Sequence, residues 1–95
     1  MPKILDAVGV TGAGDVFQLS GDQTSGKMGV VQFLLTDATV KLEGSLDRTN
    51  WIDVSNDFAG TGTEVSDGER VALMPFMRAN VTAHTTGAVS AWLEF

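Results

Sequence analysis

The second half of this chain alternates apolar and polar residues with a period of two, and this alternation constrains the fold more than any other feature. It is clearest in TVKLEGSLD, residues 39–47. A β-strand places successive side chains on opposite faces, so such a segment has one buried side and one solvent-facing side. Similar runs at 51–54, 76–85 and 88–95 predict further antiparallel strands.

Turn-forming residues divide the remaining chain into short segments. We expect strands at 16–20, 29–36, 63–66 and 69–73, and either a strand or an extended arm at 3–10. Loops are expected at 11–15, 21–27 and 55–64, and tight connections at 37–38 and 47–50. Asp67-Gly68 predicts a type I′ hairpin, and Thr86-Gly87 is expected to close a hairpin between the last two strands. Met74-Pro75 interrupts strand pairing.

These segments predict an all-β fold: one antiparallel β-sandwich or jelly-roll-like domain over residues 1–95, with seven or eight short strands. The alternative for residues 1–15 is that they form an extended N-terminal arm instead of part of the sandwich. Gly44 falls on the buried face of its strand, where a missing side chain indicates a bulky neighbour, and we expect Trp51 or Phe58 there. Trp51 is also expected to plug one end of the core.

Charge and composition argue against several classes of function. The twelve acidic and six scattered basic residues give a net charge of -6, which disfavours a nucleic-acid surface. No segment approaches the ~20 apolar residues of a membrane span, and MPKILDAVGV lacks the apolar core of a signal peptide. The absence of cysteine favours synthesis in a reducing cytoplasm, and we expect a soluble, complete chain.

A chain of 95 residues buries only about 60 to 65% of its unfolded surface, so self-association would help to stabilise it. Residues 29–36 are apolar on both faces apart from Gln32, which predicts cover on both sides, from the sandwich itself or a neighbouring subunit. Trp92 should point outward, toward a partner, an overlying loop or a stacked ligand. The expected interface residues are Trp92, Val31, Phe33, Leu35, Ile4 and Leu5.

The sequence gives only weak signals for catalytic or metal-binding residues. His84 is the only histidine, and we expect it at a hairpin tip as a surface or interface residue. Acidic residues cluster at 47–53 and 57–67, but neither run has the spacing of an EF-hand calcium loop. Gly9, Gly12 and Gly14 precede no expected helix, so a turn explains them better than a phosphate loop. We therefore expect no enzyme, no catalytic residues, no metal and no cofactor.

Three segments carry a resemblance to a known group: VKLEGSLDRTNW at 40–51, PFMRANVTA at 75–83 and TGAVSAWL at 86–93. They are similar to small virion proteins of tailed bacteriophages, in which a strand of the type EGSLDGTNW precedes one of the type PYxRANVT and a closing strand. The resemblance covers residues 39–95. This chain departs from the pattern at Arg48, where glycine is usual, and at Phe76, where tyrosine is common.

The resemblance implies a structural virion protein, most simply a capsid decoration (cement) protein. Such a protein would be made in the cytoplasm of a host bacterium and form a trimer on the head exterior, with itself and the major capsid protein as partners and neither nucleic acid nor membrane. Strands of the GSxDGxxW type also occur in sugar-binding discoidin-like sandwiches. A carbohydrate-binding module, or a tail, neck or fibre component, is therefore the alternative.

Overall fold

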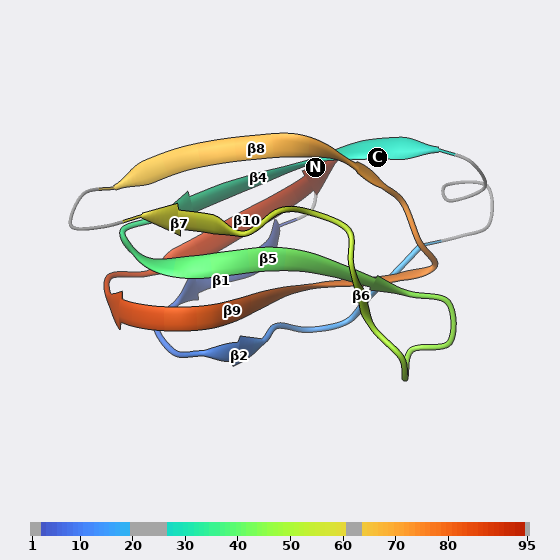
Figure 1. Ribbon diagram of the computed structural model, residues 1–95, viewed down its shortest axis with the longest axis horizontal. Coiled ribbons are helices and arrows are strands. Elements are labelled where there is room, and N and C mark those ends of the chain that lie inside the picture. The colour runs from blue at the N-terminus through green and yellow to red at the C-terminus, as the bar shows by residue number, and fades with distance from the viewer. Residues whose placement is uncertain (1–2, 20–26, 61–63, 95) are drawn as a thin grey trace.

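The computed structural model describes residues 3–19, 27–60 and 64–94, which form two antiparallel sheets packed face to face (Figure 1). Sheet A has the order β1 (Lys3–Val8), β10 (Val89–Glu94), β4 (Met28–Leu35), β8 (Val65–Ala72). Sheet B has the order β2 (Gly12–Ala13), β9 (Phe76–Thr86), β5 (Asp37–Ser45), β6 (Ile52–Asp53), while β3 (Phe17–Gln18) also pairs with β9 and β7 (Phe58–Gly60) with β5. The predicted all-β sandwich is confirmed.

The described residues form ten strands rather than seven or eight. Two of the additional strands, β2 and β7, lie in segments expected to be loops. β2 pairs with β9, and β7 pairs with β5, through backbone hydrogen bonds. Such short pairings leave no alternating side-chain pattern in the sequence, so they could not be predicted from it. The expected loop at 21–27 lies outside the described residues except for Lys27. Ser20, Thr63 and Phe95 of the expected strands also lie outside them.

Neighbouring strands in the sequence mostly lie in opposite sheets. The chain crosses between sheets from β4 to β5, from β8 to β9 and from β9 to β10. The expected hairpin of the last two strands is therefore wrong: β9 pairs with β5 in sheet B, and β10 with β4 and β1 in sheet A. Alternation identifies a strand and its buried face, but not the strand it pairs with.

The expected Asp67-Gly68 hairpin is also wrong, because β8 runs through both residues as one strand. Its eight residues pair with β4 in unbroken register, and Gly68 lies opposite Gln32. A Cβ at Gly68 would lie 2.5 Å from the backbone oxygen of Val31. Glycine is used here for close approach of two backbones rather than for a turn.

The core lies between the sheets and includes residues that we expected at a subunit interface. Val31, Phe33 and Leu35 are completely or almost completely buried within the single chain, and so are Ile4 and Leu5 of β1. The expected interface role of these five residues is therefore corrected, because the opposite sheet covers this side of sheet A within the same chain. Residues 3–8 form an edge strand of sheet A rather than an arm.

The neighbour of Gly44 is Met74, not Trp51 or Phe58. A Cβ at Gly44 would lie 2.5 Å from the Met74 sulfur. Phe58 instead packs in the core against Phe33, with ring centroids 4.7 Å apart. Trp51 is only half-buried and lies outside the core cluster, so it does not plug the sandwich.

Candidate functional site

The outer face of sheet A carries a stripe of apolar side chains, supplied by alternate residues of β4 and β10. Trp92 lies opposite Gln32, Glu94 opposite Val30, and Ser90 opposite Leu34. On β4, the side chains of Met28 and Val30 are 50% and 44% exposed. We call Met28, Val30, Leu34 and Trp92 the sheet A stripe.

Trp92 is the one expected interface residue that reaches this face, and it is half-buried there. The Lys3 ammonium nitrogen lies 5.3 Å from the centre of its ring, a cation–π contact. Beside it, Gln32 Nε2 donates to Ser66 Oγ at 3.1 Å. A shallow hollow of about 360 Å³ lies between β4 and β8, and it is lined by Val30, Val31, Gln32, Ser66, Asp67 and Gly68.

On β4, the residues expected at an interface were the odd-numbered ones, whereas the exposed residues are the even-numbered ones. Because 29–36 is apolar at both odd and even positions, the pattern did not say which set faces the core. Gln32 was the available signal: its polarity marks the even-numbered side as the outer one, which places Val30 and Met28 there. The odd-numbered set, Val31, Phe33 and Leu35, is the buried one.

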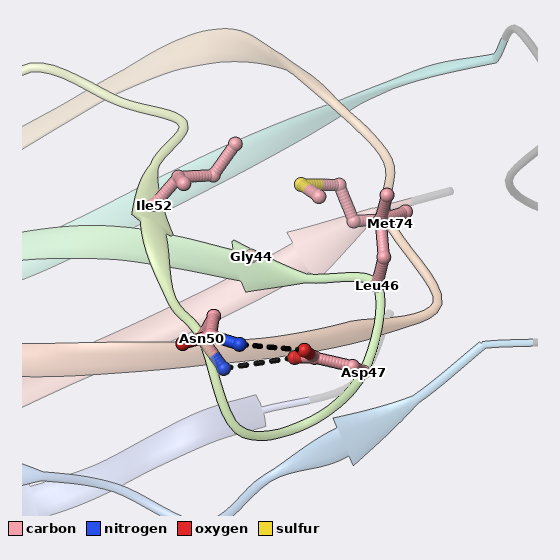
Figure 2. A pocket seen from close by; sticks show the side chains of 6 residues that line it. All are labelled: Gly44, Leu46, Asp47, Asn50, Ile52 and Met74. Atoms are coloured by element: carbon pink, nitrogen blue, oxygen red, sulfur yellow. Dashed lines mark hydrogen bonds between the residues drawn. The ribbon is translucent and has the colours of Figure 1, made fainter.

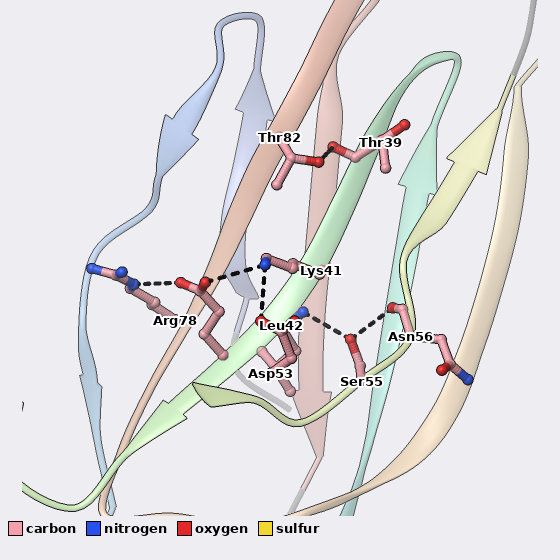
Figure 3. A network of polar contacts seen from close by, with 9 residues as sticks. Thr39, Lys41, Leu42, Asp53, Ser55, Asn56, Arg78 and Thr82 are labelled. Atoms are coloured by element: carbon pink, nitrogen blue, oxygen red, sulfur yellow. Dashed lines mark hydrogen bonds and ion pairs between the residues drawn. The ribbon is translucent and has the colours of Figure 1, made fainter. Parts of the chain in front are cut away.

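The outer face of sheet B is different, because its charged groups satisfy one another (Figure 3). Glu43 is only 7% exposed, and its Oε1 accepts a 2.8 Å hydrogen bond from Arg78 Nε. Lys41 Nζ lies 2.9 Å from Asp53 Oδ1 and 3.7 Å from Glu43 Oε2. The hydrogen bond to Asp53 raises the pKa of Lys41. The Arg78 guanidinium also lies 4.1 Å from the centre of the Trp51 ring.

The turn after β5 is locked by side-chain hydrogen bonds. Ser45 Oγ donates to Asp47 Oδ1 and accepts from the backbone N–H groups of Asp47 and Arg48. The Asp47 carboxylate also accepts from the backbone of Thr49 and Asn50, and from Asn50 Nδ2 at 2.7 Å. These bonds, led by that from the Asn50 backbone, hold the pKa of Asp47 far below its usual range.

A small apolar pocket of about 230 Å³ lies beside this turn (Figure 2). Figure 2 shows Leu46, Ile52 and Met74 around the backbone of Gly44, with the bonded Asp47 and Asn50 at the rim. Leu46 is 75% exposed and Ile52 is 57% exposed. We call this the end pocket. Alternation over residues 39–47 predicts Leu46 on the same buried face as Gly44, so the pattern gave no signal for this pocket.

The remaining candidates are not brought together. His84 is half-buried, and its Nε2–H donates to the Gly87 oxygen at 2.6 Å. Asp47 and Asp53 engage different partners, and the described residues contain no group of three histidine, cysteine, aspartate or glutamate side chains arranged to hold a metal ion. Gly12 lies in β2, and Gly14 N–H donates to the Ala79 oxygen.

Comparison of the chain with protein-family models, curated proteins and solved structures found no match. Within the part of the chain that the structure describes, no helix is long and apolar enough to cross a membrane.

Proposed function

We propose that this chain is a non-enzymatic structural protein of a tailed-phage virion, a capsid decoration protein that self-associates through the sheet A stripe. The resemblance over residues 39–95 supports the virion assignment. A trimer on the head exterior, contacting the major capsid protein, is the arrangement that this resemblance implies. Residues 3–8 belong to sheet A, so the proposed contacts come from the folded body rather than from an N-terminal arm.

The contrast between the two outer faces is the observation that carries self-association. Sheet B carries paired charges on its outer face, whereas sheet A leaves Met28 and Val30 about half exposed near Trp92, with Glu94 and Arg70 opposite Val30 at the rim. Burying apolar surface gains roughly 25 cal/mol for each Å², and apolar patches rimmed by polar residues mark protein interfaces. Joining copies would also enlarge the buried surface of a small domain.

Light scattering tests the stripe directly. We expect the unmodified chain to have the mass of an oligomer, a trimer in the simplest case, and Val30→Asp to shift it toward monomer. Thr82→Asp on the exposed part of β9 in sheet B is the matched control and should keep the oligomeric mass. A second assay adds each variant to expanded heads stripped of decoration protein. An unmodified chain that is monomeric and does not bind such heads contradicts the proposal.

The hollow beside Trp92 favours carbohydrate binding as the second candidate. A half-buried indole next to the amide of Gln32 and the hydroxyl of Ser66 has the chemistry of a sugar platform. Lys3 competes for the same indole, because its ammonium already lies over the ring. A glycan array with tryptophan fluorescence separates the two functions: a saturable sugar response that Trp92→Ala removes would support the sugar module. A tail or neck location would instead appear as antibody labelling of that substructure in micrographs.

A further inference from the structure

The strands at the margins of the two sheets differ in how much backbone they leave unpaired. The marginal strands of sheet B are only two or three residues long, and β1 of sheet A pairs with β10 through register shifts. At the other margin of sheet A, β8 is eight residues long and pairs with β4 without interruption. It lies along the upper margin of the molecule in Figure 1. Among the described residues, β8 therefore presents the longest regular edge.

The register shows which backbone groups of β8 point away from β4. Leu73 N–H donates to the Lys27 oxygen, one pair beyond the β4–β8 ladder. Because bonded and non-bonded pairs alternate between antiparallel strands, the odd-numbered residues of β8 bond to β4 and the even-numbered residues point outward. The even-numbered residues are all exposed: Ser66, Gly68, Arg70 and Ala72. An extended chain can add to such an edge as a further strand.

The charges on β8 argue against a second copy as that further strand. Two antiparallel copies of β8 in one continuous sheet are related by a two-fold axis that is centred on a residue. A centre at Gly68 places Asp67 opposite Glu69, and a centre at Asp67, Glu69 or Arg70 places that charged residue opposite itself. Like charges directly opposite each other are destabilising. The registers with the most overlap are thus disfavoured, in a chain whose net charge is already -6.

Two carboxylates on β8 instead favour a basic partner. Asp67 and Glu69 lie on the same side of the sheet as buried Val71, since all three are odd-numbered. Asp67 Oδ1 accepts from Gly68 N–H, and Glu69 Oε1 accepts from Asn56 N–H at 2.6 Å. The ion pairs found among the described residues involve neither carboxylate. A strand with lysine or arginine opposite both would supply the missing cations.

The position between these two cations faces Gly68, which presents no side chain on the outer side of the sheet. The hollow between β4 and β8 lies there, with Val30 and Gln32 in its lining and Val30 44% exposed. An aromatic side chain opposite an edge glycine can lie across that glycine. A phenylalanine at this position would therefore cover Val30. Arg70, the next residue on the same side, favours an acidic residue opposite it.

We propose that the free edge of β8 binds an extended segment of another protein as an additional antiparallel strand. That segment carries an aromatic residue opposite Gly68, between basic residues opposite Asp67 and Glu69. Backbone hydrogen bonds supply affinity in this mode of recognition, and the alternate side chains supply specificity. Such binding requires neither a virion nor self-association through the sheet A stripe.

A synthetic peptide with this pattern tests the edge: fluorescein-labelled Thr-Val-Glu-Lys-Phe-Lys-Thr-Thr amide, whose phenylalanine falls opposite Gly68 in the antiparallel register. Fluorescence anisotropy with the full chain should show saturable binding that weakens as salt is raised. Replacing both lysines of the peptide by glutamate should abolish binding. N-methylation of its phenylalanine removes an N–H that points at β8, so binding should weaken about five- to tenfold.

Arg70→Pro and Arg70→Ala are the matched pair in the protein. Both remove the guanidinium, but only proline removes the outward N–H, a change that an edge strand tolerates. A cooperative thermal unfolding transition verifies that each variant is folded. Arg70→Pro should bind the peptide about fivefold more weakly than Arg70→Ala.

Three results would overturn strand addition at β8: no saturable binding by the unmodified chain, equal binding by the two Arg70 variants, or equal binding of the lysine and glutamate peptides. Self-association that Arg70→Pro abolishes and Arg70→Ala retains would overturn it as well, since a second copy would then occupy the edge. None of these results bears on the sheet A stripe, which the Val30→Asp comparison tests separately.

Discussion

At the scale of single residues, the turn after β5 shows how side chains substitute for backbone pairing. Ser45 and Asp47 together receive five backbone or side-chain N–H groups from residues 47–50. This network keeps Arg48 at a φ of 66°, the one described non-glycine residue with positive φ. A positive φ of this size favours glycine, so Arg48 adopts a strained backbone conformation at this position.

Replacing Arg48 measures this strain. Arg48→Gly and Arg48→Ala both remove the guanidinium that lies 5.9 Å from the centre of the Phe76 ring. Only glycine relieves the left-handed backbone, so we expect Arg48→Gly to be more stable than Arg48→Ala by about 1 kcal/mol in urea unfolding. Equal stabilities of the two variants would show that the turn does not hold this conformation in solution.

Asp47 makes the turn sensitive to acid. Its hydrogen bonds lower the pKa in the folded state below the ordinary value of 3.8, so the carboxylate stabilises the fold above that pH. This contribution is lost as the pH falls below about 4 toward the folded pKa. Asp47→Asn should therefore be less stable than the parent near neutral pH, and the deficit should shrink in acid.

Urea midpoints between about pH 7 and about pH 3 give this comparison. Glu94→Gln, an exposed carboxylate on β10, corrects for the general effect of removing one negative charge. A deficit for Asp47→Asn that is constant over this range, after the correction, would mean that the charge of Asp47 contributes nothing to the turn.

At the scale of elements, β5 and β9 are joined through side chains as well as through their backbones. The Glu43–Arg78 pair connects residues in direct register on the two strands. The side chain of Glu43 is 9% exposed, whereas the side chain of Asp53, the partner of Lys41, is 57% exposed. Screening by water weakens the second pair more than the first.

Double-mutant cycles should separate the two pairs. For Glu43→Gln with Arg78→Gln, we expect a coupling of about 1 to 2 kcal/mol, because removing one partner leaves a poorly hydrated charge. For Lys41→Gln with Asp53→Asn, we expect less than about 0.5 kcal/mol. Equal couplings would contradict the difference in burial. The measurement is the free energy of urea unfolding for each single and double variant.

The strands of the second half were predictable because their side chains alternate, as in β5 and β10. Their partners were not, since β9 and β10 adjoin in sequence but belong to different sheets. Asp67-Gly68 was misleading for a similar reason: pairing with β4 outweighs local turn preference. The end pocket was missed because it depends on Leu46 turning outward at the end of its strand, and alternation assigned Leu46 to the core.

At the scale of the whole molecule, the core closes within one chain. Both faces that meet between the sheets are supplied by the same copy, from Ile4 and Leu5 at one edge to Val71 and Leu73 at the other. Association through the sheet A stripe would thus add to a core that one chain completes by itself. Stability and oligomeric state should respond to different residues.

Leu5→Ala tests this separation. Leu5 is buried in the single-chain core, so truncation should cost about 2 to 4 kcal/mol of unfolding free energy. The cost should be the same at protein concentrations differing about tenfold, because mass action changes only contacts between copies. Val30→Asp should show the opposite behaviour, with its effect fading on dilution. A loss for Leu5→Ala that disappears on dilution would place Leu5 at an interface after all.

The pairing of β1 with β10 has a mechanical consequence. These antiparallel strands lie side by side with Lys3 opposite Trp92, so the beginning of one and the end of the other meet at the same corner. Tension applied at that corner would peel the two strands apart one backbone pair after another, instead of loading every pair at once. The molecule would yield easily to a pull on its ends while resisting forces directed elsewhere on its surface.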